Sequence, residues 1–114
     1  MAGQRWVVRL AAAADSDFKH VLRWTVEHFG SLQAQRYAEV VSSALTDLTA
    51  GPEIIGARQR EELGADLFIL HVTRKGRKGR HFIVFRMQVA NGQNSIDVLR
   101  ILHDSMDLEH ESEE

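Results

Sequence analysis

The sequence contains no cysteine and only one proline among its 114 residues. Without cysteine the chain can form neither a disulfide nor a thiolate metal site, and nothing in its composition argues for secretion. It also lacks an apolar run of the roughly 20 residues that a membrane-spanning helix needs. Arg5 and Arg9 interrupt the apolar residues near the N-terminus, which argues against a signal peptide. We therefore expect a cytoplasmic protein that does not associate with a membrane.

The residues that are present suffice for one compact domain. Hydrophobic residues make up 44% of the chain, which is enough for a core at this length. We expect residues 1–107 to form a single domain, followed by a mobile acidic tail at residues 108–114.

The net charge of −2 conceals two segments of opposite sign. Six Lys and Arg but no acidic residue lie between Leu67 and Arg86, whereas six Asp and Glu but no Lys or Arg lie between Asp104 and Glu114. A basic segment in so small a domain suggests a polyanionic or acidic partner. The alternative is that the basic side chains of residues 74–80 only keep an exposed loop soluble.

Apolar residues recur at helical spacing in two consecutive segments. Asp15 or Ser16 can cap the start of the first helix, Gly30 is suited to its end, and Ser31 can cap the second. Pro52 ends the second helix because it cannot continue the hydrogen-bond ladder. A turn this short predicts an antiparallel helical hairpin. The periodic residues are Phe18, Val21, Leu22, Thr25 and Phe29, then Ala34, Tyr37, Ala38, Val41, Ala44, Leu45 and Leu48.

Strand-like runs surround this hairpin in the sequence. Asn91-Gly92 is a strong signal for a two-residue hairpin turn, and residues 53–66 show no period and are expected to form a loop. The order β-α-α-β-β-β predicts a two-layer α+β domain in which an antiparallel sheet packs on an N-terminal helical hairpin. The predicted strands cover residues 6–10, 67–73, 82–89 and 95–102.

The aromatic residues of the first strand and the helices, Trp6 and Trp24 among them, are expected to pack in the core or at its rim. Any that are exposed could instead anchor a partner.

The histidines suggest neither a metal nor a cofactor. The six lie at positions 20, 28, 71, 81, 103 and 110, and none forms a recognised ligand spacing. The glycines at 76 and 79 lack the spacing and the following helix of a phosphate loop. We expect no metal and no cofactor.

A phosphate-binding or ribonuclease site can be drawn from four residues. Arg86 and Arg100 could hold a phosphate, His103 could move a proton, and Glu62 could act as a base. The alternative is structural: the two arginines pair with Asp97, Glu62 or the tail, and His103 caps the end of its strand. The structural alternative is favoured because the catalytic set is incomplete.

The chain resembles the ParE branch of the RelE/ParE toxin superfamily over roughly residues 6–107. The resemblance rests on the order and spacing of several short pieces. These are Ala14 with Asp17-Phe18, Phe29-Gly30, Ala34 with Tyr37, Leu48 with Pro52, residues 81–86, and residues 96–103 followed by Met106-Asp107.

This resemblance implies the toxin of a type II toxin–antitoxin module, a plasmid stabilisation protein held inactive by a cognate antitoxin. ParE-like toxins poison DNA gyrase and are not enzymes, whereas RelE-like relatives cleave mRNA in the ribosome. No tyrosine follows the last strand here, and an acidic tail would be repelled by RNA phosphates. We therefore expect a gyrase-directed toxin, with a RelE-like ribosome-dependent mRNA endoribonuclease as the alternative.

Antitoxin tails that fold on their toxins bury apolar groups and pair charges. We expect the open face of the sheet and the groove beside the helical hairpin to receive such a tail. Arg74, Arg77, Arg80 and Arg86 would suit an acidic partner.

Overall fold

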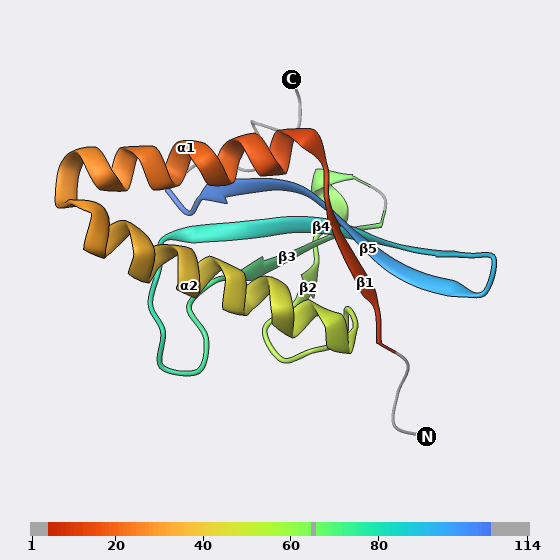
Figure 1. Ribbon diagram of the computed structural model, residues 1–114. Coiled ribbons are helices and arrows are strands. Elements are labelled where there is room, and N and C mark those ends of the chain that lie inside the picture. The colour runs from red at the N-terminus through yellow and green to blue at the C-terminus, as the bar shows by residue number, and fades with distance from the viewer. Residues whose placement is uncertain (1–4, 65, 106–114) are drawn as a thin grey trace.

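The computed structural model describes residues 5–64 and 66–105. Figure 1 shows two layers, with a helical hairpin lying across one face of a twisted five-stranded sheet. This is the two-layer α+β arrangement that the sequence predicts; the predicted tail at 108–114 lies outside the described residues. The elements are β1 (Val7–Leu10), α1 (Ala12–Phe29), α2 (Ser31–Asp47), the 3₁₀ turn η1 (Leu48–Ala50), β2 (Arg58–Gln59), the 3₁₀ turn η2 (Glu61–Leu63), β3 (Leu67–His71), β4 (His81–Ala90) and β5 (Gln93–His103).

The sheet has the strand order β1-β5-β4-β3-β2. β3, β4 and β5 form the predicted antiparallel meander. Asn91 and Gly92 join β4 to β5, and their φ angles of 53° and 74° suit a two-residue hairpin turn. β1 instead runs parallel to β5, with Val7 opposite Ser95. The sheet is therefore not antiparallel throughout, because a four-residue apolar strand carries no local signal for its direction.

The first helix begins earlier than the sequence suggested. α1 starts at Ala12, and its N-cap, Ala11, makes no side-chain cap, so the prediction of Asp15 or Ser16 as the cap is wrong. The Ala11 N–H donates to the Val98 carbonyl at 2.9 Å, which means that the chain passes from the sheet directly into the helix. Gly30, with φ of 92°, is the N-cap of α2 in place of Ser31.

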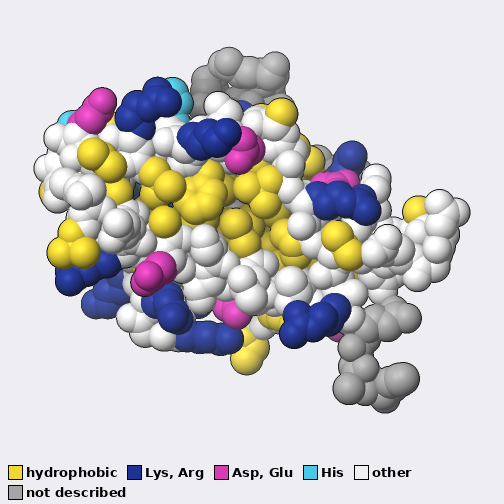
Figure 2. Space-filling model, viewed as in Figure 1, with side chains coloured by type: hydrophobic (Ala, Val, Ile, Leu, Met, Phe, Trp, Pro, Cys, Tyr) yellow, Lys and Arg dark blue, Asp and Glu magenta, His cyan; other side chains and the backbone are white. Residues whose placement is uncertain are grey.

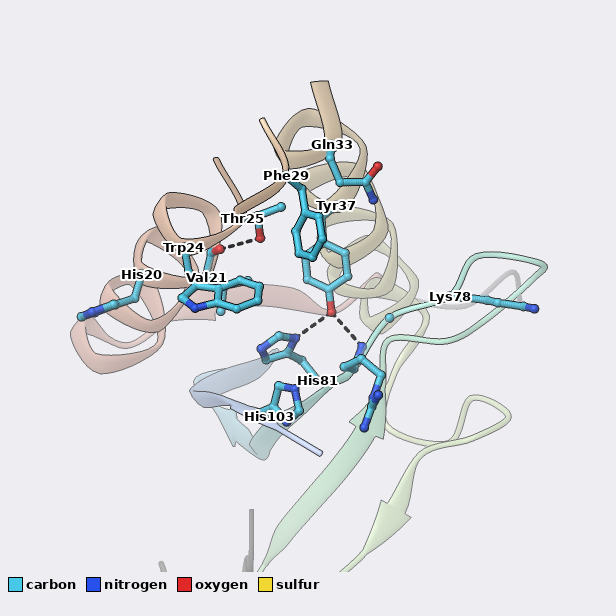
Figure 3. Close-up of a pocket in the computed structure, with 12 residues that line it drawn as sticks. His20, Val21, Trp24, Thr25, Phe29, Gln33, Tyr37, Lys78, His81 and His103 are labelled. Carbon is cyan, nitrogen blue, oxygen red and sulfur yellow. Dashed lines mark hydrogen bonds between the residues drawn. The ribbon is translucent and has the colours of Figure 1, made fainter. Parts of the chain in front are cut away.

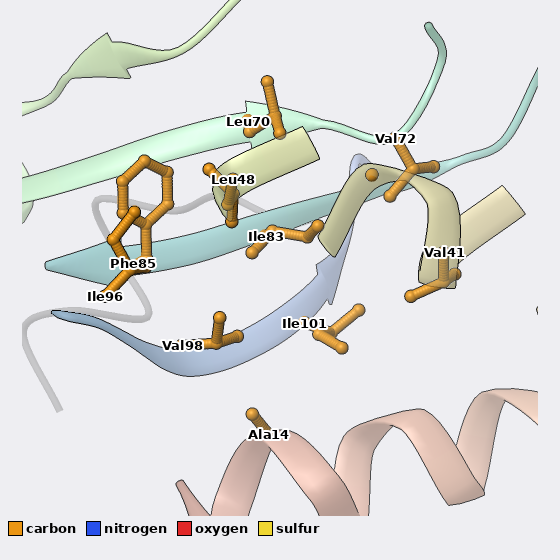
Figure 4. Packing of buried hydrophobic residues seen from close by; sticks show 11 residues of the cluster. Ala14, Val41, Leu48, Leu70, Val72, Ile83, Phe85, Ile96, Val98 and Ile101 are labelled. Carbon is orange, nitrogen blue, oxygen red and sulfur yellow. The ribbon is translucent and has the colours of Figure 1, made fainter. Parts of the chain in front are cut away.

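The main core lies between the helical hairpin and the sheet (Figure 4). Ile83 and Phe85 of β4 and Ile96 and Val98 of β5 face it at the two-residue period of a strand. A bulge in β5 opposite Val84 and Phe85 then brings Ile101, three residues after Val98, onto the same face. Its buried residues are Ala14, Val41, Ala44, Leu48, Leu70, Val72, Ile83, Phe85, Ile96, Val98 and Ile101.

The opposite face of the sheet is less open than expected. Ile69, Val84 and Leu102 form a second cluster there, with exposed fractions of 5 to 8%. Leu63 of η2 and Phe82 pack against these three residues. The centre of this face is therefore covered within the chain, because the segment between β2 and β3 carries an apolar side chain onto it.

Candidate functional site

A pocket of about 740 Å³ lies where the helical hairpin meets the start of β4 and the end of β5 (Figure 3). Its size is in the range of small-ligand sites, and its walls combine aromatic rings with imidazoles. The lining residues are His20, Val21, Trp24, Thr25, Phe29, Gln33, Tyr37, Lys78, Gly79, Arg80, His81 and His103.

Tyr37 and His81 form the polar part of the pocket wall. The Tyr37 hydroxyl accepts the Arg80 main-chain N–H at 2.9 Å and lies 2.6 Å from Nδ1 of His81. A hydroxyl that donates to Nδ1 leaves the imidazole proton on Nε2. Burial raises the pKa of Tyr37. Burial, followed by the nearby His103, lowers the pKa of His81 to about 4. Both groups are therefore neutral at pH 7.

Gly79 is what allows Tyr37 to come so close. A β carbon on Gly79 would lie 2.5 Å from a methyl group of Val72 and 2.7 Å from the Tyr37 hydroxyl. Real β carbons do not approach other atoms this closely, so any larger residue would displace the tyrosine. No pattern in the sequence predicts this role of Gly79, because a tertiary contact leaves no local signal.

Apolar side chains are exposed at the tip of the helical hairpin, beside the pocket. Trp24 is 52% exposed and Phe29 is 66% exposed, and Val26 and Leu32 are exposed as well. Trp24 stacks on His28 with ring centroids 4.1 Å apart. Figure 2 shows further hydrophobic side chains gathered between α1 and α2, with Lys and Arg side chains along the borders. Exposed apolar surface of this kind marks interaction sites.

Arg100 has an anionic partner that the sequence analysis did not name. Its guanidinium makes two hydrogen bonds to Asp17 of α1, Nε to Oδ2 at 2.8 Å and NH2 to Oδ1 at 3.0 Å. Asp17 Oδ2 also accepts the Ile101 main-chain N–H at 2.9 Å. β1 ends opposite Val98, so beyond that point Asp17 takes the place of a neighbouring strand.

The four residues considered for a ribonuclease site are not brought together. Arg86 lies opposite Asp97 and 3.9 Å from its carboxylate, as the structural alternative expected. His103 lies opposite His81, five β4 residues from Arg86, which is about 17 Å along a strand. Glu62 lies in η2, beyond β3 at the other side of the sheet, and its carboxylate binds Arg60.

His103 ends its strand with a local contact. Its Nδ1 accepts the Ser105 main-chain N–H at 3.1 Å, which closes the turn after β5.

Some basic side chains of the loop between β3 and β4 form ion pairs with Asp47, and others do not. Arg74 is only 14% exposed and binds Asp47 at 3.0 Å, and Lys75 binds the same carboxylate at 3.1 Å. Burial alone would raise the pKa of Asp47, but hydrogen bonds from the two cations lower it. Arg77 and Lys78 have no carboxylate within ion-pair distance among the described residues.

Arg80 belongs to a separate network at the end of β5. Its Nε lies 3.1 Å from Asp104 Oδ1, and His71 Nε2 lies 3.0 Å from Asp104 Oδ2. The hydrogen bond from His71, and then the one from Arg80, lower the pKa of Asp104. Of the four arginines predicted to bind a partner, Arg74, Arg80 and Arg86 each lie within ion-pair distance of a carboxylate, whereas Arg77 has no such carboxylate among residues 5–64 and 66–105.

Within residues 5–64 and 66–105, no group of His, Asp and Glu side chains is placed to hold a metal ion. The same residues contain no helix that is both long enough and apolar enough to cross a bilayer.

Two solved structures of bacterial proteins have this fold. One is described as the chromosomal ParDE TA system from P. aeruginosa, with a TM-score of 0.59 and 17% identity over 89% of this chain and 98% of that chain. The other is a YoeB/ParE toxin from Agrobacterium tumefaciens, with a TM-score of 0.58 and 10% identity over 85% of this chain and 96% of that chain. The fold is therefore that of small ParE- and YoeB-type toxins.

The family model described as "ParE toxin of type II toxin-antitoxin system, parDE" matches residues 8–108, nearly the whole chain. The chain belongs to this family, which confirms the resemblance drawn from its sequence. No curated protein sequence matches it significantly.

Proposed function

We propose that this chain is a toxin that acts by binding DNA gyrase and that a cognate antitoxin neutralises it by covering its helical face. The family places the chain among the toxins of type II toxin–antitoxin systems. The gyrase target is proposed from the activity that the resemblance to ParE-like toxins implies, and the mode of neutralisation is inferred from the surface of this chain.

One observation supports a binding function over a catalytic one. The candidate catalytic side chains are paired or far apart, whereas apolar side chains are exposed together on the helical hairpin. Arg86 and Arg100 are already paired, and Glu62 lies in η2 beyond β3, whereas His103 lies at the end of β5. Metal-free RNA cleavage requires an acid, a base and cations around one phosphate. The exposed rings of Trp24 and Phe29, by contrast, are suited to a protein interface.

The same surface suits an antitoxin with apolar and acidic residues. An apolar side chain can enter the pocket beside Tyr37, and carboxylates can reach the unpaired Arg77 and Lys78 of the adjoining loop. We propose this pocket and loop as the antitoxin-binding surface in place of the open face of the sheet, because Ile69 and Val84 fill the centre of that face. Arg74 contributes to the loop's own structure instead, because Asp47 holds it.

The proposal is tested with the purified chain in a gyrase supercoiling reaction. Inhibited supercoiling together with trapped double-strand breaks, both reversed by the cognate antitoxin, is the expected result. A Trp24→Ser/Phe29→Ser variant should lose inhibition while keeping its melting temperature, because both side chains are largely exposed. Exposed Ile55 on the loop before β2 provides a matched control, since Ile55→Ser removes an exposed apolar side chain that does not line the pocket.

An uninhibited gyrase reaction, combined with codon-positioned mRNA cuts in a translating extract, would replace this proposal with the RelE-like endoribonuclease. Normal growth of cells that express the chain without an antitoxin would instead indicate a member without toxicity.

A further inference from the structure

The pocket at the helical hairpin has an apolar and basic lining with no acidic member. Twelve residues line it, and none is Asp or Glu. Trp24 and Tyr37 supply apolar ring surface, whereas Lys78 extends outward at the rim (Figure 3). A ligand that matches these walls carries an apolar side chain next to negative charge.

The chain leaves the sheet at the wall of this pocket. The Asp104 main-chain N–H donates to the Arg80 carbonyl at 2.7 Å, which continues the β4–β5 ladder by one residue. The Ser105 N–H then donates to Nδ1 of His103, a lining residue. Residue 106 therefore follows Asp104 by two positions and follows His103, which lines the pocket, by three.

Residues 106–114, which follow this contact, combine apolar and acidic side chains, as a ligand of the apolar and basic pocket should. Residues 106–114 contain Met106 and Leu108, five carboxylate side chains and no Lys or Arg. Nine residues can extend over about 30 Å, so length does not limit access to the pocket. A segment tethered this closely has an effective concentration on the order of millimolar, which lets a weak contact be occupied.

We propose that the chain's own residues 106–114 dock in this pocket in the free protein. Leu108 enters beside the rings of Trp24 and Tyr37, and the carboxylates that follow lie against the basic rim that includes Lys78. The acidic tail is thereby an intramolecular ligand of the surface that a partner must reach.

This docking has a consequence for neutralisation, which rests on the proposed function. A tail that fills the pocket for nine-tenths of the time lowers the apparent affinity of a competing antitoxin about tenfold. Leu108→Ser should therefore tighten antitoxin binding, because it removes the competitor and leaves the pocket unchanged.

The docking itself is tested on the full chain without any partner. ¹H–¹⁵N spectra should show the Trp24 indole signal and the Gly79 amide signal shifting in Leu108→Ser, although both residues are remote from position 108 in sequence. The indole signal of Trp6, which packs near Gly51, is the internal reference and should not move. Ser112→Ala, a substitution in the same tail that removes no apolar side chain, is the matched control.

The absence of cysteine permits a second measurement. A nitroxide attached to Ser112→Cys should broaden the Gly79 and Trp24 signals, and adding Leu108→Ser to the labelled chain should abolish that broadening. Unmoved Trp24 and Gly79 signals in Leu108→Ser, or broadening that survives it, would overturn the proposal and leave the pocket open for a partner's segment. Neither result depends on gyrase or antitoxin, so failure here is separate from failure of the proposed function.

Discussion

Replacing Asp17 tests the claim that Arg100 has a structural role. Asp17 joins α1 to the edge of β5 through Arg100 and through the Ile101 main-chain N–H. Asp17→Ala removes the acceptor and leaves that N–H without its partner, at a cost of about 1–3 kcal/mol. The Arg100 side chain is 46% exposed, so solvent screening limits the loss of the ion pair to about 0.5–1 kcal/mol.

The expected sum is a loss of about 1.5–4 kcal/mol in the free energy of unfolding. For a domain of this length that corresponds to a fall of about 10 °C in melting temperature. Asp17→Asn should lose only about 1 kcal/mol, since its amide oxygen can still accept the Ile101 N–H.

Urea unfolding followed by circular dichroism measures these differences. Asp15→Ala is the matched control, because Asp15 lies on the same helix and makes only an exposed ion pair with Lys19, at 2.9 Å. A loss in Asp17→Ala no larger than that in Asp15→Ala would refute the reasoning. Arg100→Gln adds a functional readout: loss of RNA cleavage at unchanged stability would assign Arg100 to catalysis.

Three further predictions concern the pocket and the basic loop. Because burial and a neighbouring histidine lower the pKa of His81 to about 4, its contribution to stability should be fully present above about pH 6.5 and be lost as the pH falls toward 4; His81→Gln should flatten that part of the slope in urea titrations, and an unchanged slope would contradict it. Gly79→Ala should cost about 1–3 kcal/mol, because its β carbon would lie 2.5 Å from a methyl group, and a calorimetric melting curve matching the parent's would count against this. Arg77→Glu with Arg80→Glu should weaken antitoxin binding, measured by calorimetry, more than tenfold, whereas Arg58→Glu on the short strand β2 should not. Equal effects of the two changes would refute the proposal that the loop of residues 74–80 contacts the antitoxin.

Much of the secondary structure could be predicted from local patterns. The helical period over residues 31–48 and the Asn91-Gly92 turn each reflect interactions between residues close in the chain, and the structure has both features. The start of α1 could not be read in this way. Ala11, the N-cap, has no capping side chain and instead donates its N–H to the Val98 carbonyl of the sheet, and Asp15, which has the chemistry of a cap, lies inside the first turn.

In the candidate site, too, local features could be predicted from the sequence, whereas contacts between distant residues could not. The sequence marked the loop of residues 74–80 as basic, but it could not separate Arg74, which pairs with Asp47, from Arg77, which has no carboxylate within ion-pair distance in the part of the chain that the structure describes. It also gave no sign that Tyr37 and His81, 44 positions apart, share a hydrogen bond. Such pairings depend on which elements the fold brings together.

The sequence by itself determined the helical hairpin and the antiparallel meander, because apolar periodicity and turn residues act over a few positions. It also indicated the family, through the resemblance of several short pieces in their order and spacing. Only the tertiary structure decided the parallel pairing of β1 with β5, the capture of Arg100 by Asp17 and the pocket beside Trp24. Each of these joins residues distant in the chain. Their free energy comes from contacts that exist only after the helices have packed on the sheet, so no local pattern of residues records them.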